Sequence, residues 1–165
     1  MKKSLTFVVF ALLASFLVAA DKKTDAKKPM AVKMEHKVTV PGDIQWGDAP
    51  PNLPAGAKMA VLAGDPGKAG LYTIRLKTPD GYKVAAHWHP AAENLTVISG
   101  EFHLGVGDKL DESQAKTMTA GSFGLMPARM HHYAWTKGET EVQVYGMGPF
   151  KLIYVNPADD PSKKK

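Results

Sequence analysis

Cysteine is absent from the 165 residues of this chain. Without it the protein forms no disulfide, carries no lipid on a thiol and offers no thiolate to a metal. A fold of this composition depends on its core alone. Any metal that it binds must be held by nitrogen and oxygen atoms.

A basic surface of the kind that binds nucleic acid is also missing from the body of the chain. The sequence has 21 lysines and arginines against 16 aspartates and glutamates, a formal net charge of +5. Six lysines fall within residues 22–37 and three form residues 163–165, whereas residues 38–157 hold ten basic and eleven acidic side chains. The positive charge belongs to the ends, and we expect no nucleic-acid partner.

The first twenty residues have the pattern of a secretory signal. Lys2 and Lys3 give a positive start, residues 5–17 an apolar stretch, and residues 18–20 the small side chains of a cleavage site. The alternative is a membrane anchor, which needs a longer apolar run. We therefore expect cleavage after Ala20, a periplasmic or secreted protein, and no transmembrane segment in its mature form.

No long stretch has the 3.6-residue apolar period of an amphipathic helix. Short alternating or β-branched runs recur instead, with turns about every eight to twelve residues, which predicts an all-β sandwich or barrel. The proline-rich segment 43–57 around Trp46 predicts an ordered loop that lies over another part of the structure. The expected strands are 58–63, 71–76, 83–89, 95–98, 101–106, 122–126, 132–136, 141–147 and 151–155. The expected divisions are a signal peptide (1–20), a flexible lysine-rich lead (21–37), a β-barrel domain (38–157) and a charged tail (158–165).

Two histidines and a glutamate stand close together in the middle of the chain. His87 and His89 are two residues apart, so on an extended strand their side chains point to the same face. Glu93 follows after Pro90-Ala91-Ala92, an interruption that can bend the chain and bring a carboxylate toward the imidazoles. Two imidazoles and one carboxylate suit a redox-active or Lewis-acid metal with open positions, and His132 is a fourth candidate ligand.

These residues match the motifs of a known superfamily. The run Gly81-x5-His87-x-His89-x3-Glu93-x6-Gly100 has every fixed position of the first cupin motif, and Gly121-x5-Pro127-x4-His132 has most of the second. The chain therefore resembles the cupins from about Val38 to Pro157. The resemblance implies a double-stranded β-helix (jelly-roll) barrel, a homodimer, and one divalent metal held by His87, His89, Glu93 and His132.

Two positions depart from the second motif. Arg129 stands where glycine is usual, two residues after the proline, and Thr136 stands where asparagine is usual. Neither is a ligand. The departures concern the shape of the turn before His132 and a contact at the end of a strand.

The remaining histidines have more ordinary explanations. His103 lies between Phe102 and Leu104, so alternation puts it on the opposite face from them and predicts a structural role. His131 and His132 are neighbours, so only one of them faces the interior of a barrel. The motif selects His132, which places His131 at the rim.

Three polar side chains beside the expected ligands are candidates for binding a substrate. Arg75 either clamps an acidic substrate through its guanidinium or points outward and pairs with Glu141 or Glu101. Tyr133 and Tyr145 lie in strands that should frame the barrel, where packing is the alternative role.

Two classes of function fit these residues. The first is a metalloenzyme of dioxygenase, isomerase or lyase type that acts on a small organic substrate, an acidic one included, with Glu93 as a base. The second is a non-catalytic protein that binds or senses a metal or small ligand. A roomy cavity beside the metal favours the enzyme, and a filled barrel favours the binder. Iron, manganese, zinc, nickel and copper all suit the nitrogen and oxygen ligands.

Overall fold

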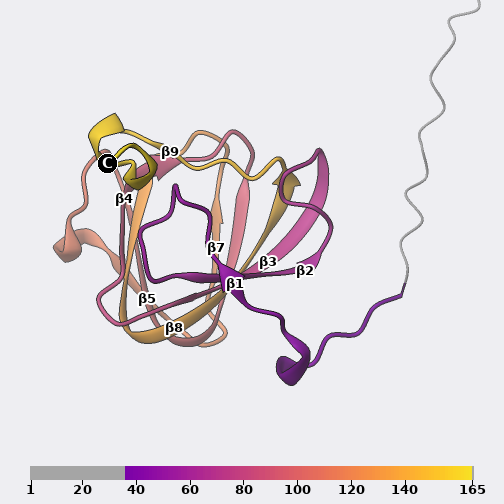
Figure 1. Ribbon diagram of the computed structural model, residues 1–165. Helices are drawn as coiled ribbons and strands as arrows, with labels where there is room; N and C mark the ends of the chain where they lie inside the picture. The colour runs from indigo at the N-terminus through magenta and orange to yellow at the C-terminus, as the bar shows by residue number, and fades with distance from the viewer. Residues whose placement is uncertain (1–35, 165) are drawn as a thin grey trace, which may run out of the picture. The chain divides into compact units, whose positions relative to one another are not determined.

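The structure, a computed structural model, describes residues 36–164. The expected signal peptide and all but the end of the lysine-rich lead lie outside the described residues. Nine β-strands and four short 3-10 helices make up the described part (Figure 1). No helix within it is both long and apolar enough to cross a membrane. The strands are β1 (Gly47–Asp48), β2 (Lys58–Ala63), β3 (Gly70–Thr78), β4 (Lys83–Trp88), β5 (Glu93–Val106), β6 (Lys116–Thr119), β7 (Phe123–Met126), β8 (His132–Gly148) and β9 (Ile153–Tyr154). The helices are η1 (Pro41–Asp43), η2 (Glu112–Gln114), η3 (Pro157–Asp159) and η4 (Pro161–Lys163).

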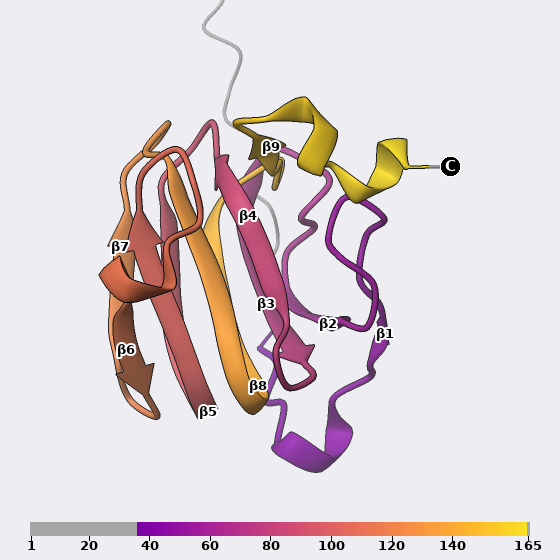
Figure 2. The same ribbon diagram turned by 90° about the vertical axis from the view of Figure 1, so that its left-hand side faces the viewer.

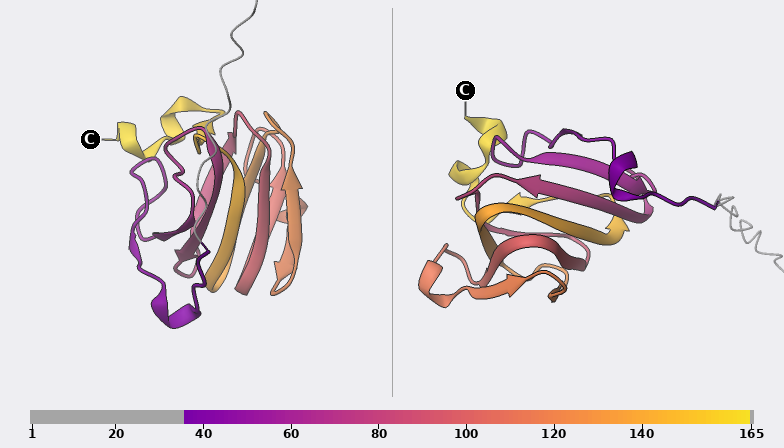
Figure 3. Two further views of the ribbon diagram at one scale, coloured as in Figure 1. Left: turned by 90° about the vertical axis from the view of Figure 1, so that its right-hand side faces the viewer. Right: turned by 90° about the horizontal axis from the view of Figure 1, so that it is seen from below.

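All strand pairs are antiparallel, and the two longest strands, β5 and β8, pair with each other along most of their length. In one half of the sheet, β7 lies beside the first part of β5. β3 lies beside the second part of β8 and is followed by β2 and β1. In the other half, β6 lies beside the second part of β5. β4 lies beside the first part of β8 and is followed by β9. The sheet curls so that its two halves face each other, as Figures 2 and 3 show. The expected all-β jelly-roll barrel is confirmed.

Two of the expected strand boundaries are wrong. Segments 95–98 and 101–106 were expected as separate strands but form one strand, β5, and segments 132–136 and 141–147 likewise form β8. The physical reason is a pair of register shifts where β5 opposes β8, which let both strands bend from one half of the sheet to the other without leaving it.

Gly100 lies at this bend. Its φ of +82° is a conformation that side chains with a Cβ rarely adopt. A Cβ here would also clash with the carbonyl oxygen of Glu139 and with Thr140 on the facing strand. The last glycine of the first motif is therefore required because β5 and β8 approach closely where they turn.

Apolar side chains from the two halves of the sheet meet in two buried clusters. The larger contains Tyr72, Ile74, Leu95, Val97, Phe102, Met118, Met126, Ala134, Val142 and Val144. The smaller contains Leu53, Ala57, Tyr82, Val84, Leu152 and Tyr154. Its first two members come from the loop between β1 and β2, so the proline-rich segment does lie over the barrel, as its composition predicts.

Candidate metal centre

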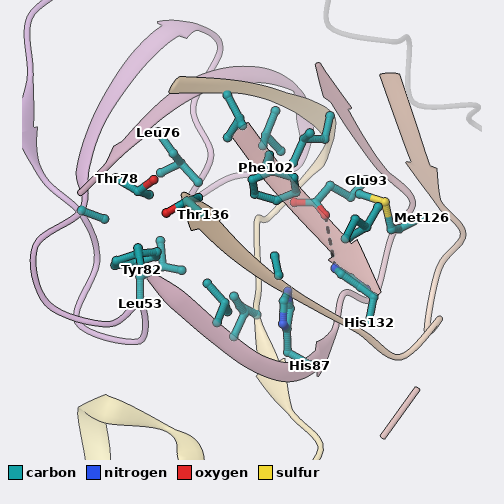
Figure 4. A pocket seen from close by; sticks show the side chains of 18 of the residues that line it. Leu53, Leu76, Thr78, Tyr82, His87, Glu93, Phe102, Met126, His132 and Thr136 are labelled. Atoms are coloured by element: carbon teal, nitrogen blue, oxygen red, sulfur yellow. Dashed lines mark ion pairs between the residues drawn. The ribbon is translucent and has the colours of Figure 1, made fainter. Parts of the chain in front are cut away.

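Three histidines from two neighbouring strands meet inside the barrel. His87 lies in β4, His89 directly follows that strand, and His132 begins β8, where the register pairs it with His87. Their exposed fractions are 4, 6 and 2%. One ring nitrogen of each lies within 4.8 Å of the corresponding nitrogens of the others. Figure 4 shows two of them, His87 and His132, at the same end of a cavity.

A β-bulge aims His87 into the barrel. Val84 and His87 are three residues apart and would face opposite sides of a regular strand, yet both line the same cavity. The pairing of β4 with β8 shifts register between these two residues, which changes the alternation there. The bulge thus lets Val84 and His87 of β4 face inward together with His89, which directly follows the strand.

Each of the three histidines has its Nδ1 fixed by a backbone carbonyl. The distances are 2.8 Å from His87 to Ala85, 2.7 Å from His89 to Lys151, and 3.0 Å from His132 to Met130. A carbonyl oxygen only accepts hydrogen bonds, so each Nδ1 must carry the proton and donate it. Each Nε2 is left with a lone pair, the form in which a neutral histidine binds a metal.

Glu93, the first residue of β5, brings a carboxylate to the same place. Its Oε2 lies 3.5 Å from Nε2 of His89. It lies 3.4 Å from Nε2 of His132, the ion pair that Figure 4 marks with a dashed line. Both nitrogens are buried and have no hydrogen-bond partner. Buried polar atoms are nearly always paired, so two unpartnered nitrogens beside a carboxylate mark a place that a cation would fill. The residues present fit a divalent metal.

Burial favours the uncharged form of His87 and of His89. It is the main reason that the pKa of His87 falls to about 3, and the proximity of His132 and His89 adds to it. Burial likewise lowers the pKa of His89. Burial alone would raise the pKa of Glu93, but the neighbouring histidines, His89 foremost, bring it below its ordinary value. Neutral imidazoles and an ionised carboxylate are the protonation states that metal binding needs.

An apolar cavity of about 60 Å³ lies beside the histidines. It runs from His87, His132 and Glu93 at one end to Leu53 and Tyr82 at the other, as Figure 4 shows. The volume leaves room for about four to six water-sized groups, since one water occupies about 10–15 Å³ on this measure. The barrel is therefore not completely filled, and its free space adjoins the nitrogen atoms.

The two departures from the second motif leave the site intact. Arg129 has a φ of +65°, the left-handed conformation that glycine adopts at little cost. Its N–H donates to the carbonyl of His89 at 2.8 Å, so the turn before His132 keeps its shape and carries backbone strain. Thr136 is 2% exposed, and its hydroxyl donates to the carbonyl of Pro79 at 2.9 Å, which supplies the contact at the strand end.

The three side chains expected to bind a substrate lie outside the cavity. Arg75 donates to Glu141 at 2.9 Å and to Gln143 at 3.2 Å, on the face of β3 that points away from the barrel. Tyr145 is 39% exposed on the corresponding face of β8. Tyr133 is buried, and its hydroxyl donates to a backbone carbonyl just before η2. Of the two roles open to Arg75, the structure has the outward pair with Glu141.

His103 and His131 lie where alternation puts them. His103 is buried on the opposite face of β5 from the cavity, and its ring stacks on that of Trp135 with centroids 3.5 Å apart. His131 is partly exposed, with Nδ1 2.6 Å from a carboxylate oxygen of Asp108. Neither belongs to the cluster formed by the three inward histidines.

Three residues that the sequence did not single out contribute to the site. Phe150 stacks on His89 with ring centroids 5.4 Å apart. Leu53 and Tyr82 close the far end of the cavity. Leu53 had a signal, because it is an isolated leucine in a proline-rich loop that was expected to cover something. The sequence around Phe150 and Tyr82 has no signal that indicates their place in the site.

A family model described as "Domain of unknown function (DUF4437)" matches residues 14–152. No curated protein matches the chain. Among solved structures, the polyketide cyclase RemF from Streptomyces resistomycificus is 14% identical, with a TM-score of 0.65, over 78% of this chain and 92% of that one. A putative acetylacetone dioxygenase from Methylibium petroleiphilum is 21% identical, with a TM-score of 0.59, over 78% and 87%. An RmlC-like cupin from Shewanella frigidimarina is 19% identical, with a TM-score of 0.54, over 68% and 91%. At these identities the likeness establishes the fold.

Proposed function

The chain belongs to the DUF4437 family and is a cupin, and from this premise we propose that it is a metal-dependent enzyme acting on a small organic molecule. The observation that carries the proposal is the set of three buried histidines whose Nδ1 atoms are bonded to carbonyls. The three nitrogens left for a metal lie within 4.8 Å of one another, and those of His89 and His132 lie next to the carboxylate of Glu93. We propose these four side chains as the ligands.

A divalent metal bound there would supply Lewis-acid or redox chemistry to a coordinated oxygen atom. The chain's own residues have separate tasks. The three carbonyl contacts hold the imidazoles in the correct tautomer and orientation. The apolar walls exclude water from the space beside the histidines. Glu93 is the one carboxylate that lines the cavity among the described residues, so it is our candidate for holding or taking a proton.

Two of the structural neighbours support a small-molecule substrate. One is a polyketide cyclase and another a putative acetylacetone dioxygenase, and both share the fold of this chain. Fold alone does not establish function. The local support is the cavity, whose free space adjoins the proposed ligand atoms.

The experiment has two stages. Elemental analysis of protein purified without an affinity tag should find about one equivalent of a metal such as iron, manganese, zinc, nickel or copper. The site is then loaded with Co²⁺, and azide is added while the visible spectrum is recorded. A spectral change would reveal a coordination position open to an exogenous ligand, as an enzyme needs. Bound metal with no change on azide would favour the alternative, a non-catalytic metal-binding or sensing protein.

We also propose that the protein is a homodimer, paired through the outer face of the half-sheet formed by β7, β5, β8 and β3. Five large apolar side chains are exposed there, namely Leu71, Phe123, Leu125, Tyr145 and Met147. The outward residues between them are mostly neutral, so two copies would meet without repulsion, as a symmetric interface requires. Light scattering on Leu125→Glu should find monomers where the wild-type protein gives dimers. A monomeric wild-type protein would refute this.

Export remains our proposal for the location of the protein. It rests on the pattern of residues 1–20, which lie outside the described residues. The mass of protein recovered from the periplasm should correspond to a chain that begins at Asp21. An intact Met1 in the recovered protein would contradict it.

A further inference from the structure

The walls of the cavity carry almost no charge. Among the residues that the structure describes, no lysine or arginine lines it, and Glu93 is the sole carboxylate. The walls are mostly aliphatic, with Leu53, Leu76, Val84, Leu95, Val142 and Val144 among the residues that form them. All the charged and metal-binding groups gather at one end, where Figure 4 shows His87, His132 and Glu93.

The hydroxyl groups in the walls have no proton left to donate to a ligand. Thr78, Thr136 and Tyr82 line the cavity, and each hydroxyl donates its proton to a backbone carbonyl. The acceptors are the carbonyls of Thr140, Pro79 and Pro54, at 3.3, 2.9 and 2.8 Å. Trp135 also lines the cavity, and its buried Nε1 is the one N–H donor of the described lining side chains without a partner; its ring stacks on that of His103.

A negative charge on the part of a ligand that lies away from the histidines would thus lose its water and find no cation, and the Nε1 of Trp135 is the one donor without a partner among the described lining side chains. Burying a charge without a partner is strongly unfavourable. Resting on the proposed metal centre, we infer that the substrate carries its oxygen atoms or its charge only at the histidine end. The rest of the substrate is an uncharged, apolar body that extends toward Leu53. The sequence admits an acidic substrate clamped by Arg75; because Arg75 lies outside the cavity, an acidic group is now expected only at the histidine end.

Leu53 sets the length of that body. It is 6% exposed and reaches the cavity from the loop between β1 and β2. The loop is held on both sides of Leu53 by tyrosine hydroxyls, which donate to the carbonyl of Pro54 from Tyr82 at 2.8 Å and to the carbonyl of Asn52 from Tyr154 at 2.9 Å. This segment is anchored over the barrel, so the side chain of Leu53 limits the free space.

The first test compares butanoate with butanedioate, which share a carboxylate and a length but differ by a charge at the far end. Isothermal titration calorimetry on zinc-loaded protein should show that butanedioate binds at least about tenfold more weakly than butanoate. Equal or tighter binding of butanedioate would overturn the inference while leaving the metal centre in place. Measuring bound zinc beforehand separates this outcome from failure of the metal site.

The second test enlarges the far end. Leu53→Ala should improve the binding of octanoate relative to butanoate by about tenfold, because the removed carbons free space at the end of the cavity. Leu110→Ala is the matched control, since Leu110 lies in the outer loop before η2 and does not line this cavity. An unchanged preference in Leu53→Ala would refute the role of Leu53.

A metal-free comparison keeps the inference testable if no metal binds. In protein without metal, 1-butanol should raise the melting temperature more than 1,4-butanediol does at equal concentration, because only the first has an apolar end. If 1-butanol is the better ligand and zinc does not bind, the proposed function fails and the apolar cavity stands. If the diol stabilises equally, the inference about the cavity fails.

Discussion

The barrel holds two kinds of buried histidine, and they differ in a way that exposure does not reveal. His87, His89 and His132 are 4, 6 and 2% exposed on the inner face, and His103 is 6% exposed on the outer face. The inner histidines use Nδ1 for a carbonyl, and His89 and His132 have no partner for Nε2. The burial of a histidine therefore does not identify a ligand, whereas the contacts of its two ring nitrogens distinguish the inner histidines from the outer one.

The outer histidine has both nitrogens occupied. Nε2 of His103 lies 2.9 Å from a carboxylate oxygen of Glu101, and Nδ1 lies 3.2 Å from the hydroxyl of Thr117. Its ring is parallel to that of Trp135, with 2° between the planes. Every polar atom of this side chain has a partner, so a metal would have to displace an existing contact. The two regions thus predict different responses to metal and to mutation.

The largest expected effect is the fall in melting temperature when the metal is removed from the inner histidines. A metal at about 1,000 times its Kd stabilises the folded state by about 4 kcal/mol. Chelation should lower the melting temperature by roughly 10 °C in the wild-type protein and in His103→Ala alike. Differential scanning calorimetry with and without a chelator measures this. A chelator that changes neither melting temperature would show that the inner histidines hold no metal.

The second largest effect should be the loss of zinc affinity when one inner histidine is replaced. His132→Ala is expected to weaken zinc binding by more than about 100-fold, because losing only a supporting contact already costs about 10–100-fold. Competition with a chromophoric chelator gives the affinity. His103→Ala should bind zinc like the wild-type protein. If the two variants lose zinc equally, the distinction between inner and outer histidines is wrong.

The outer histidine should matter for stability instead. His103→Ala removes the stack on Trp135 and the hydrogen bonds to Glu101 and Thr117, and we expect it to lower the free energy of unfolding by about 1–2 kcal/mol. Urea denaturation of the metal-free protein measures this. His131→Ala is the control, since an exposed pair such as that with Asp108 contributes less than about 0.5 kcal/mol. A loss in His131→Ala as large as in His103→Ala would contradict the account.

The smallest expected effect concerns the turn that leads to His132. Arg129→Gly relieves a left-handed residue but makes the unfolded chain more flexible, so the net gain in stability should be about 0.5 kcal/mol. Ala128→Gly has only the second effect, because among the described non-glycine residues Arg129 alone has a positive φ. Thermal unfolding should therefore rank Arg129→Gly above the wild-type protein and Ala128→Gly below it. The reverse ranking would show that the turn is not strained.

Much of the fold could be predicted because its signals are local. Short alternating runs and turn residues gave the all-β class, and motif spacing selected His132 over its neighbour. The continuous strands β5 and β8 could not be predicted, because Ser99 and Gly100 look like a turn when the facing strand is unknown. The bulge between Val84 and His87 has no sequence signal either, since it depends on pairing with β8.

The direction of the Tyr133 side chain can be predicted from alternation. Alternation assigned His131 to the opposite face from His132, and the same rule applied to Tyr133 predicts that it too faces outward, as it does. Val142 and Val144 point into the cavity, so alternation predicts that Tyr145 points outward. The face of the strand, more than the chemical type of the side chain, thus decides whether a residue of β8 reaches the cavity.

The most direct test of the account follows the histidine nitrogens themselves during a zinc titration. Long-range ¹H–¹⁵N NMR spectra resolve Nδ1 and Nε2 and identify the tautomer of each ring. We expect His87, His89 and His132 to carry their proton on Nδ1. Their Nε2 resonances should shift together at about one equivalent of zinc, while the resonances of His103 should not shift. Inner rings protonated on Nε2, or a zinc-dependent shift at His103 instead, would contradict it.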